Sequence, residues 1–301
     1  MGLSLHNIKR WLLMLTGNSI YHVDQGIGKA ISLGGYYNDM TQKVIMGDSN
    51  VDESGIPFLV HKDGTHIHMP TMVFQYGLGA YDLWLLEKNR ENLDRSIRCA
   101  DWALEHQQDD GAWNNFYYII PNHPYSAMPQ GEAASLLLRV WNETGEEKYK
   151  TAAEKAVTYM LTSIDDGGVS LIDGNDWYLM EYVHKPTVLN GWVFALFGLY
   201  DMNRVNASEI TKTAWVRSID TLKRTLPEFD NGFWSMYNCS GTITSSFYHK
   251  LHIAQMNALY QLTGETVFAE YEEKWTRYQQ KLLNRSRAFV IKSVQKLKER
   301  G

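Results

Sequence analysis

The sequence predicts a mainly α-helical protein in which helical hairpins build an α/α toroid, an incomplete ring of inner and outer helices. After residue 70, apolar residues recur at spacings of three and four, which is the period of an amphipathic helix. Many of these segments end in a turn that contains glycine, the usual left-handed residue beyond a helix. Pairs of helices recur at intervals of roughly forty residues, and hairpins that cannot cover their own apolar faces must stack.

We expect two parts in the chain. In the N-terminal arm, residues 1–70, glycine and polar residues interrupt short apolar runs, which indicates turns between short strands that cover the cleft. Residues 71–301 form the toroid and carry the catalytic site. The helices expected there, in chain order, span residues 72–86, 93–106, 130–141, 147–161, 191–202, 208–226, 253–262 and 267–283.

Composition excludes several classes of protein. With 44% hydrophobic and 21% charged residues, the 301-residue chain is ordinary globular material rather than a disordered, collagen-like or coiled-coil protein. Its net charge of −5 argues against a nonspecific nucleic-acid partner. Two cysteines, Cys99 and Cys239, exclude a disulfide scaffold and leave one bridge open. The 10 Trp and 18 Tyr suit a core, but exposed aromatic side chains also form platforms for sugar rings.

We expect a soluble, cytoplasmic protein without a membrane span. The apolar run at residues 11–15 is shorter than a usual signal-peptide core, and no small-residue cleavage site is evident. No stretch approaches the roughly 18 apolar residues of a membrane helix. No glycine-rich phosphate loop is present, so we expect no cofactor.

Three segments carry candidate chemistry. In the first, there are two alternatives. Ser126 and Glu132 are helix-capping groups, or Glu132 and Gln130 face a cavity. In the second, residues 176–182 combine three aromatic side chains with Asp176 and Glu181 ahead of an apolar helix, which favours a binding loop with a carboxylate base.

The third segment contains His249 and His252 at a His-x-x-His spacing. On a helix this spacing puts both rings on one side, so the pair is either a set of metal ligands or two hydrogen-bonded core histidines. No cysteine or His-Glu-x-x-His frame accompanies them, so we expect no metal.

Together, these segments resemble the C-terminal domain of D-glucuronyl C5-epimerases, which convert D-glucuronate to L-iduronate within heparan-type polymers. The matching segments are Ser126-Ala127-Met128-x-Gln130-Gly131, Trp177-Tyr178…Glu181-Tyr182, Val188-Leu189-Asn190-Gly191, Leu226-Pro227…Tyr237 and Tyr248-His249-x-x-His252-Ile253-x-Gln255. The resemblance extends upstream to Tyr21-His22-x-Asp24 and Gln75-Tyr76-Gly77-Leu78. The β-barrel region of the animal enzymes is missing, so this chain resembles a minimal version.

The resemblance implies a site for C5 epimerisation. Such a site needs one acid and one base on opposite faces of the sugar ring, and it must stabilise an enediolate. Glu181 and Tyr248 correspond to this pair, in either order. Tyr182 and Tyr237 are expected beside them as further catalytic residues that line the sugar site. The expected substrate-binding residues are Tyr21, Tyr36 or, in the alternative register, Tyr37, together with Gln130, Trp177, Asn190, His249, Lys250 and His252.

One departure from the family concerns the substrate carboxylate. The animal enzymes carry an arginine three residues after the position of Tyr237, where this chain has Ser240. The carboxylate then needs another cation, for which Lys185, Lys250, His249 and His252 are candidates. The expected partner is an anionic uronate-containing polysaccharide, sulfated or unsulfated, and the resemblance also implies a homodimer.

Three rival functions stay open. A polysaccharide lyase begins with the same abstraction of the C5 proton. An α/α-toroid glycoside hydrolase would combine Glu181 with Asp176 or Asp230 across a cleft. A non-catalytic glycan-binding module would keep the aromatic residues alone.

Overall fold

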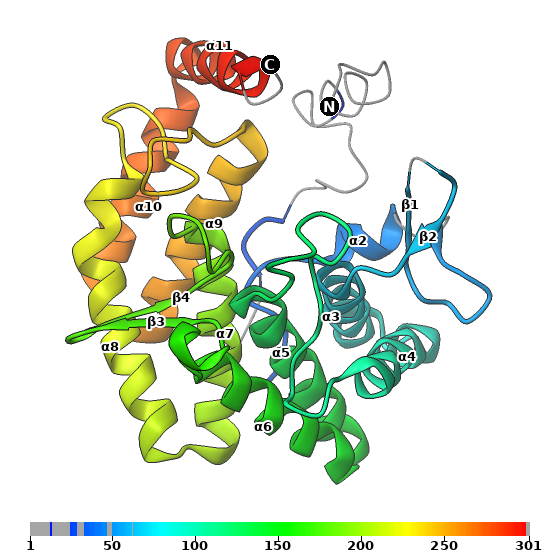
Figure 1. Cartoon of the computed structure of the whole chain (residues 1–301). Helices are drawn as coiled ribbons and strands as arrows, with labels where there is room; N and C mark the ends of the chain where they lie inside the picture. The colour runs from blue at the N-terminus through cyan, green and yellow to red at the C-terminus, as the bar shows by residue number, and fades with distance from the viewer. Residues whose placement is uncertain (1–12, 14–24, 29–32, 47–49, 62, 299–301) are drawn as a thin grey trace.

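The structure is a computed structural model of the chain, and it describes residues 13, 25–28, 33–46, 50–61 and 63–298. Within these residues, helical hairpins follow one another around the molecule (Figure 1). Their helices are α3 (Pro70–Glu87), α4 (Arg90–His106), α5 (Ala127–Thr144), α6 (Glu147–Leu161), α7 (Leu189–Asn206), α8 (Glu209–Thr225), α9 (Ser246–Thr263) and α10 (Thr266–Gln280). Each expected helix has a counterpart, so the mainly α prediction is confirmed.

The hairpins form an arc of inner helices with outer helices around it. The inner helices α3, α5, α7 and α9 contact one another in that order, and each packs against the outer helix that follows it in the chain. Because the inner helices are enclosed, they are apolar nearly all round: α7 buries every residue from Leu189 to Leu199. Among the described residues no comparable contact joins α9 to α3, so the toroid is incomplete.

Two glycines let the inner helices α5 and α7 approach closely. A Cβ atom added at Gly198 would lie 2.2 Å from the backbone oxygen of Gly131, and one added at Gly131 would lie 2.5 Å from the Cα of Ala195. Real side chains do not reach such distances. These two glycines therefore fix the spacing of the helices that flank the site described below.

The N-terminal arm packs against the first inner helix. It contains the short helix α2 (Thr41–Ile45) and an antiparallel sheet of two strands, β1 (Leu59–Val60) and β2 (His66–Ile67). The expected β-containing arm is therefore present. The backbone N–H of Tyr36 donates to Oδ1 of Asp82 on α3 over 2.8 Å, which holds the arm on this helix.

A buried ion pair anchors the same arm to the inner helices. Arg139 on α5 lies 2.6 Å from Asp201 on α7, and both side chains are fully buried. The hydroxyls of Tyr37 and Ser135 also donate to Asp201, and Arg139 donates to the backbone oxygen of Gly35. Burial of two ions is costly unless they are paired and hydrogen-bonded. Here both conditions are met.

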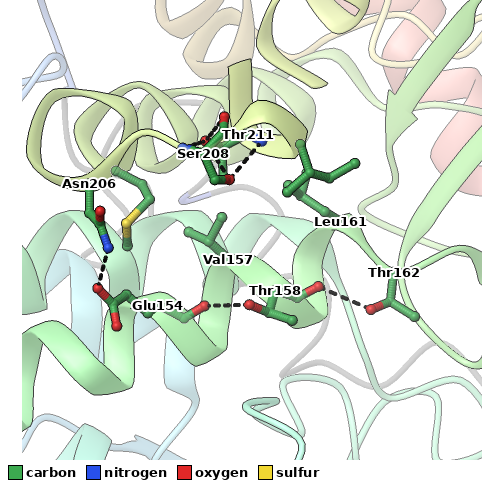
Figure 2. Close-up of a pocket in the computed structure, with 10 residues that line it drawn as sticks. Glu154, Val157, Thr158, Leu161, Thr162, Asn206, Ser208 and Thr211 are labelled. Atoms are coloured by element: carbon green, nitrogen blue, oxygen red, sulfur yellow. Dashed lines mark hydrogen bonds between the residues drawn. The ribbon is translucent and has the colours of Figure 1, made fainter. Parts of the chain in front are cut away.

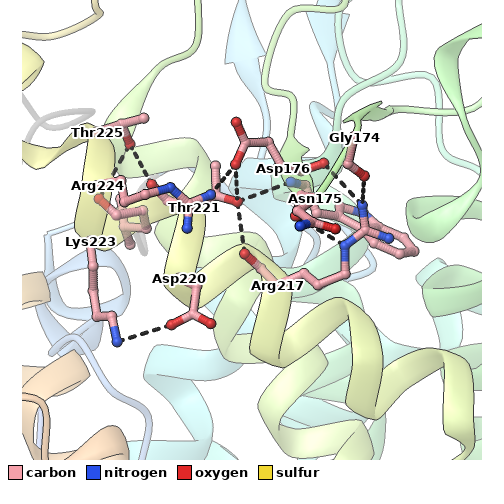
Figure 3. A network of polar contacts seen from close by, with 11 residues as sticks. Gly174, Asn175, Asp176, Arg217, Asp220, Thr221, Lys223, Arg224 and Thr225 are labelled. Carbon is pink, nitrogen blue, oxygen red and sulfur yellow. Dashed lines mark hydrogen bonds and ion pairs between the residues drawn. The ribbon is translucent and has the colours of Figure 1, made fainter.

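Two further elements were not expected from the sequence. A hairpin of β3 (Ser170–Asp173) and β4 (Asp176–Leu179) lies between α6 and α7 in the chain, and α11 (Leu282–Lys298) follows α10 as a separate helix. The expected helix at 267–283 was therefore too long, since α10 ends at Gln280. Figure 3 shows how the hairpin is tied to α8, with Arg217 donating to the backbone oxygens of Gly174 and Asn175.

Cys99 is buried, Cys239 is exposed, and both are free thiols, so the disulfide that the sequence left open is not formed. In the part of the chain that the structure describes, every helix is too short or too polar to cross a membrane.

Candidate active site

Glu181 lies two residues after β4 and is almost completely buried, with 4% of its surface exposed. Its Oε1 accepts a hydrogen bond from the Tyr237 hydroxyl over 3.1 Å, and its Oε2 has no hydrogen-bond partner among the residues that the structure describes. Gly191 in the first turn of α7 lies directly against it, because an added Cβ would stand 2.2 Å from Oε2. The absence of a side chain at Gly191 therefore makes room for this carboxyl group.

Burial raises the pKa of Glu181 to about 7, although hydrogen bonds from Tyr237 and Tyr182 and the charge of Lys185 act to lower it. Desolvation disfavours the ionised form, and these contacts compensate for it only in part. A carboxyl group that titrates near neutral pH can both accept and release a proton, as a general base requires.

Three tyrosines from separate parts of the chain gather around Glu181. Tyr182 follows it directly, Tyr237 comes from the loop before α9, and Tyr248 belongs to the first turn of α9. The rings of Tyr237 and Tyr248 meet edge to face, with their centroids 5.2 Å apart. Burial, and next to it the charge of Glu181, raises the pKa of Tyr182 and of Tyr237, so both hydroxyls are proton donors at neutral pH. The structure thus brings together all four residues expected to be catalytic.

Buried amide groups of the inner helices lie next to this cluster. Neither amide atom of Gln130 has a partner in the described ranges of the chain, and the same is true of Oδ1 of Asn190 and Oε1 of Gln255. The Gln255 amide nitrogen donates to the backbone oxygen of Asn190, the neighbour of Gly191. Buried polar atoms normally have partners. These amides are therefore suited to hydrogen-bond a polar ligand such as a sugar hydroxyl.

The structure separates the two alternative tyrosines of the arm. The Tyr37 hydroxyl donates to Asp201, so Tyr37 belongs to the ion-pair network in the core. Tyr36 is also buried, but its hydroxyl has no partner among the described residues, and burial followed by the charge of Glu132 raises its pKa. Tyr36 is therefore the tyrosine whose hydroxyl is available to a ligand. Tyr21 lies outside the described residues.

Trp177 makes its contacts away from Glu181. Its indole N–H donates to Oγ of Ser170 on β3 over 2.9 Å, and the guanidinium of Arg217 on α8 lies 5.1 Å from its ring centroid. It is 3% exposed. These contacts place Trp177 in the packing between the hairpin and α8, and they do not present it to a substrate.

The His-x-x-His pair lies in the core, as in the hydrogen-bonded interpretation. His249 accepts from the backbone N–H of Ser235 through Nδ1, lies 3.1 Å from the carbonyl oxygen of Trp275 through Nε2, and stacks on Trp234. His252 contacts the Ser235 hydroxyl over 3.1 Å. Burial lowers the pKa of both imidazoles to about 3, so both are neutral and neither can supply a cation. In the described ranges no group of three potential metal-ligating side chains is found.

The lysine candidates differ in their positions. Lys250 is exposed on α9, and Lys185 is exposed with its ammonium 4.8 Å from the ring centroid of Tyr182. A lysine that the sequence did not identify, Lys292 of α11, is buried and lies 5.9 Å from the ring centroid of Tyr237. Periodicity could not reveal it, because the packing of α11 on the Tyr237 loop is a tertiary contact.

A second carboxyl group belongs to Glu132, which the sequence left either as a helix-capping group or as a residue that faces a cavity. The helix-capping interpretation holds for Ser126, whose hydroxyl accepts from the backbone N–H of Met128. Glu132 instead lies fully buried within α5. The backbone N–H of Ala127, at the start of α5, donates to the oxygen of Met180 next to Glu181 over 2.8 Å, and the charge of Glu181 acts to raise the pKa of Glu132. A charged residue inside an otherwise apolar inner helix is the sequence signal that points to it.

A hollow of about 390 Å³ lies elsewhere, between α6, the end of α7 and the start of α8 (Figure 2). The polar groups in its walls bond to one another: Asn206 donates to Glu154, and Ser208 and Thr211 form the capping box of α8. It contains none of the residues around Glu181. We therefore place the candidate active site at Glu181.

Comparison with known proteins is consistent with this placement. Residues 109–277 match the family model described as the D-glucuronyl C5-epimerase C-terminus. The chain is 28% identical over 224 residues to a D-glucuronyl C5-epimerase of Caenorhabditis elegans, covering 64% of this chain and 36% of that protein. It is 27% identical over 155 residues to an uncharacterised protein of Methanocaldococcus jannaschii, covering 50% of each. The chain thus matches half or less of the length of these relatives.

Two solved structures share the fold. One is cellobiose 2-epimerase from Bacillus thermoamylovorans, with a TM-score of 0.56 and 10% identity over 79% of this chain and 67% of that one. The other is an unsaturated glucuronyl hydrolase from a Bacillus species that degrades glycosaminoglycan, with a TM-score of 0.53 and 14% identity over 79% and 66%. At these identities the likeness concerns the fold alone.

Proposed function

This chain belongs to the D-glucuronyl C5-epimerase family, and we propose that it epimerises D-glucuronate residues at C5 to L-iduronate within a polysaccharide. It would then be an isomerase that acts on an anionic uronate polymer. One observation carries the proposal: a buried carboxyl group, Glu181, lies among three tyrosines inside the segment that matches the family, and one of its oxygens has no partner in the described residues.

The reaction begins when the Glu181 carboxylate takes the C5 proton. The electron pair of the C–H bond moves into the adjacent carboxylate of the substrate, which becomes an enediolate. Tyr248 then gives its hydroxyl proton to C5 on the opposite face, which restores the carboxylate and inverts the configuration. The Glu181 carboxyl group returns its proton to solvent, and the tyrosinate takes one up. Glu181 is suited to act as the base in the first step, because a group with a pKa of about 7 is partly ionised at neutral pH.

Deuterium wash-in tests the proposal. The protein is incubated in deuterated water with oligosaccharides of unsulfated heparosan, N-sulfated heparosan and chondroitin. These polymers differ in sulfation, because Ser240 in place of the family arginine does not determine whether the substrate is sulfated. We expect deuterium at C5 of intact chains together with newly formed iduronate. Absorbance from an unsaturated uronate end would show a lyase instead, and a wild type that labels none of these polymers would overturn the proposal.

The hydrolase alternative receives no support from the carboxylates named for it. Asp176 pairs with Arg224 on α8. Asp230 accepts from the indole N–H of Trp275 over 2.9 Å and pairs with Lys274 over 2.9 Å. Both groups are therefore engaged in structural contacts, and neither is presented opposite Glu181 as an acid–base partner.

A further inference from the structure

Glu132 is a buried carboxyl group that the proposed proton transfers do not use. Its side chain is fully buried in α5, and its Oε1 accepts a hydrogen bond from the Gln75 amide over 2.7 Å. Within the described part of the chain, its Oε2 has no hydrogen-bond partner. Gln75 in turn accepts from Gln25 of the arm. One oxygen of Glu132 is therefore fixed, and the other is available to a ligand.

Charged and titratable groups reach Glu132 from three directions. Lys43 at α2 acts on it as a positive charge, Glu181 acts as a negative charge, and Tyr36 responds to its charge. Burial raises the pKa of Glu132 to about 8 and lowers the pKa of Lys43 to about 8. At neutral pH both groups therefore hold their proton. The pair then carries one net positive charge, and the acid retains an O–H that can donate.

We propose that Glu132 and Lys43 bind the carboxylate of the uronate whose C5 proton Glu181 removes. The inference rests on the proposed function. The protonated carboxyl group of Glu132 donates a hydrogen bond to a carboxylate oxygen, and the ammonium of Lys43 balances its charge. Both interactions strengthen as negative charge grows on those oxygens in the enediolate, so they stabilise the transition state more than the bound substrate. A buried acid held neutral so that it can donate is an established device for this purpose.

This assignment supplies the cation that the family arginine would provide. Ser240 stands at that position, and its hydroxyl donates to Asn238. His249 and His252 are neutral, and Lys250 is exposed on α9. Lys43, by contrast, is half-buried, and the charge of Glu132 acts to raise its pKa. A substrate anion approaching a protein of net charge −5 needs such a local positive site.

Calorimetric binding tests the assignment without depending on turnover. Oligosaccharides of unsulfated heparosan, chondroitin and alginate are titrated at about pH 7 and about pH 9. For wild type we expect affinity to fall at least about tenfold at the higher pH, because ionised Glu132 repels the substrate carboxylate. Glu132→Gln keeps the shape but cannot ionise, so its affinity should fall less than that of wild type, and the remaining fall reflects the loss of the Lys43 charge. Glu132→Met serves as a second variant that cannot ionise, and circular dichroism checks the fold of both.

The Lys43→Met variant provides an independent test. It should weaken binding at neutral pH and move the alkaline fall to higher pH, because it removes the charge that lowers the pKa of Glu132. Glu143→Gln, at the exposed end of α5, and Lys212→Met, on the surface of α8, are the matched controls and should resemble wild type. Carboxyl-reduced heparosan, which lacks the anion, should bind without the pH dependence.

Three results would overturn the assignment: an alkaline fall in Glu132→Gln as large as that of wild type, an alkaline fall in Lys43→Met that moves to lower pH, or no binding of any of the three uronates. Failure of the proposed function looks different. In that case the wild type binds uronates with the expected pH dependence but washes no deuterium into C5.

Discussion

The hydroxyl of Tyr237 donates a hydrogen bond to Oε1 of Glu181 across 3.1 Å. It connects the loop before α9 to the segment after β4, and it leaves Oε2 as the oxygen without a protein partner. A donor to a carboxylate favours the ionised form, which opposes the effect of burial. This single contact therefore helps to set the pH at which the proposed base becomes active.

Replacing Glu181 by glutamine removes basicity and retains shape. We expect C5 deuterium wash-in to fall by at least the roughly 100-fold that is typical of losing a general base, with an unchanged circular-dichroism spectrum. Near-normal wash-in would remove Glu181 from the mechanism.

The Tyr237→Phe variant should shift the pH dependence of the reaction. Glu181 acts as a base only when ionised, so kcat/KM for wild type should rise with pH through the pKa of about 7. The variant loses the hydrogen bond that lowers this pKa, so its acidic limb should lie at higher pH. Initial rates of deuterium wash-in across the pH range give the pH at which the acidic limb rises. An acidic limb that stays in place or moves to lower pH in the variant would contradict the prediction.

Tyr248→Phe should separate exchange from inversion. The variant deletes one oxygen and keeps the ring that packs on Tyr237. The free energy of unfolding should therefore change only by about 1 kcal/mol, the value of one hydrogen bond. Inversion needs both faces of the sugar and should nearly vanish. Exchange on the Glu181 face needs one face, so deuterium should still enter D-glucuronate with retained configuration.

The two substrate epimers provide the internal control for Tyr248. Polymers rich in L-iduronate should remain unlabelled by the variant, since their C5 proton faces Tyr248. Equal loss of labelling from both epimers would mean that Tyr248 binds the ring and moves no proton.

A methyl group at position 191 should displace Glu181. In Gly191→Ala the new carbon would stand 2.2 Å from Oε2, so the carboxyl group must move. We expect wash-in to fall more than about tenfold, because the base loses its alignment with C5. Gly26→Ala is the control, since none of the described residues lies within 4 Å of a Cβ at that position, and it should keep full activity. A Gly191→Ala variant as active as this control would show that the contact is not needed.

The helices could be predicted because their apolar period is a local property of the chain. Their ends were less predictable. The pattern at 267–283 continues across Lys281, where the backbone leaves the helix before α11 begins at Leu282. The β3–β4 hairpin is short, and its attachment to α8 is a tertiary contact that no local pattern encodes.

The catalytic candidates were found through motif order, and the structure adds what order cannot supply. Tyr36 and Tyr37 are adjacent and identical in type, so only packing could distinguish them: one reaches Asp201 and the other lies near Glu132. His249 and His252 were expected to bind the substrate, and only the structure shows that both are hydrogen-bonded in the core. Lys43 and Glu132 come from distant parts of the chain, and only the docking of the arm brings them together.

The anchoring of the arm also has a consequence for the order of folding. The hydrogen bond from Arg139 to the oxygen of Gly35 spans 104 residues, and that from Tyr37 to Asp201 spans 164. The helical hairpins, in contrast, join neighbours in the chain, and local contacts cost less loop-closure entropy and form faster. We expect the hairpins to fold first and the arm to dock afterwards. Lys43 belongs to the arm, so we expect the proposed binding site for the substrate carboxylate to be the last part of the molecule to form.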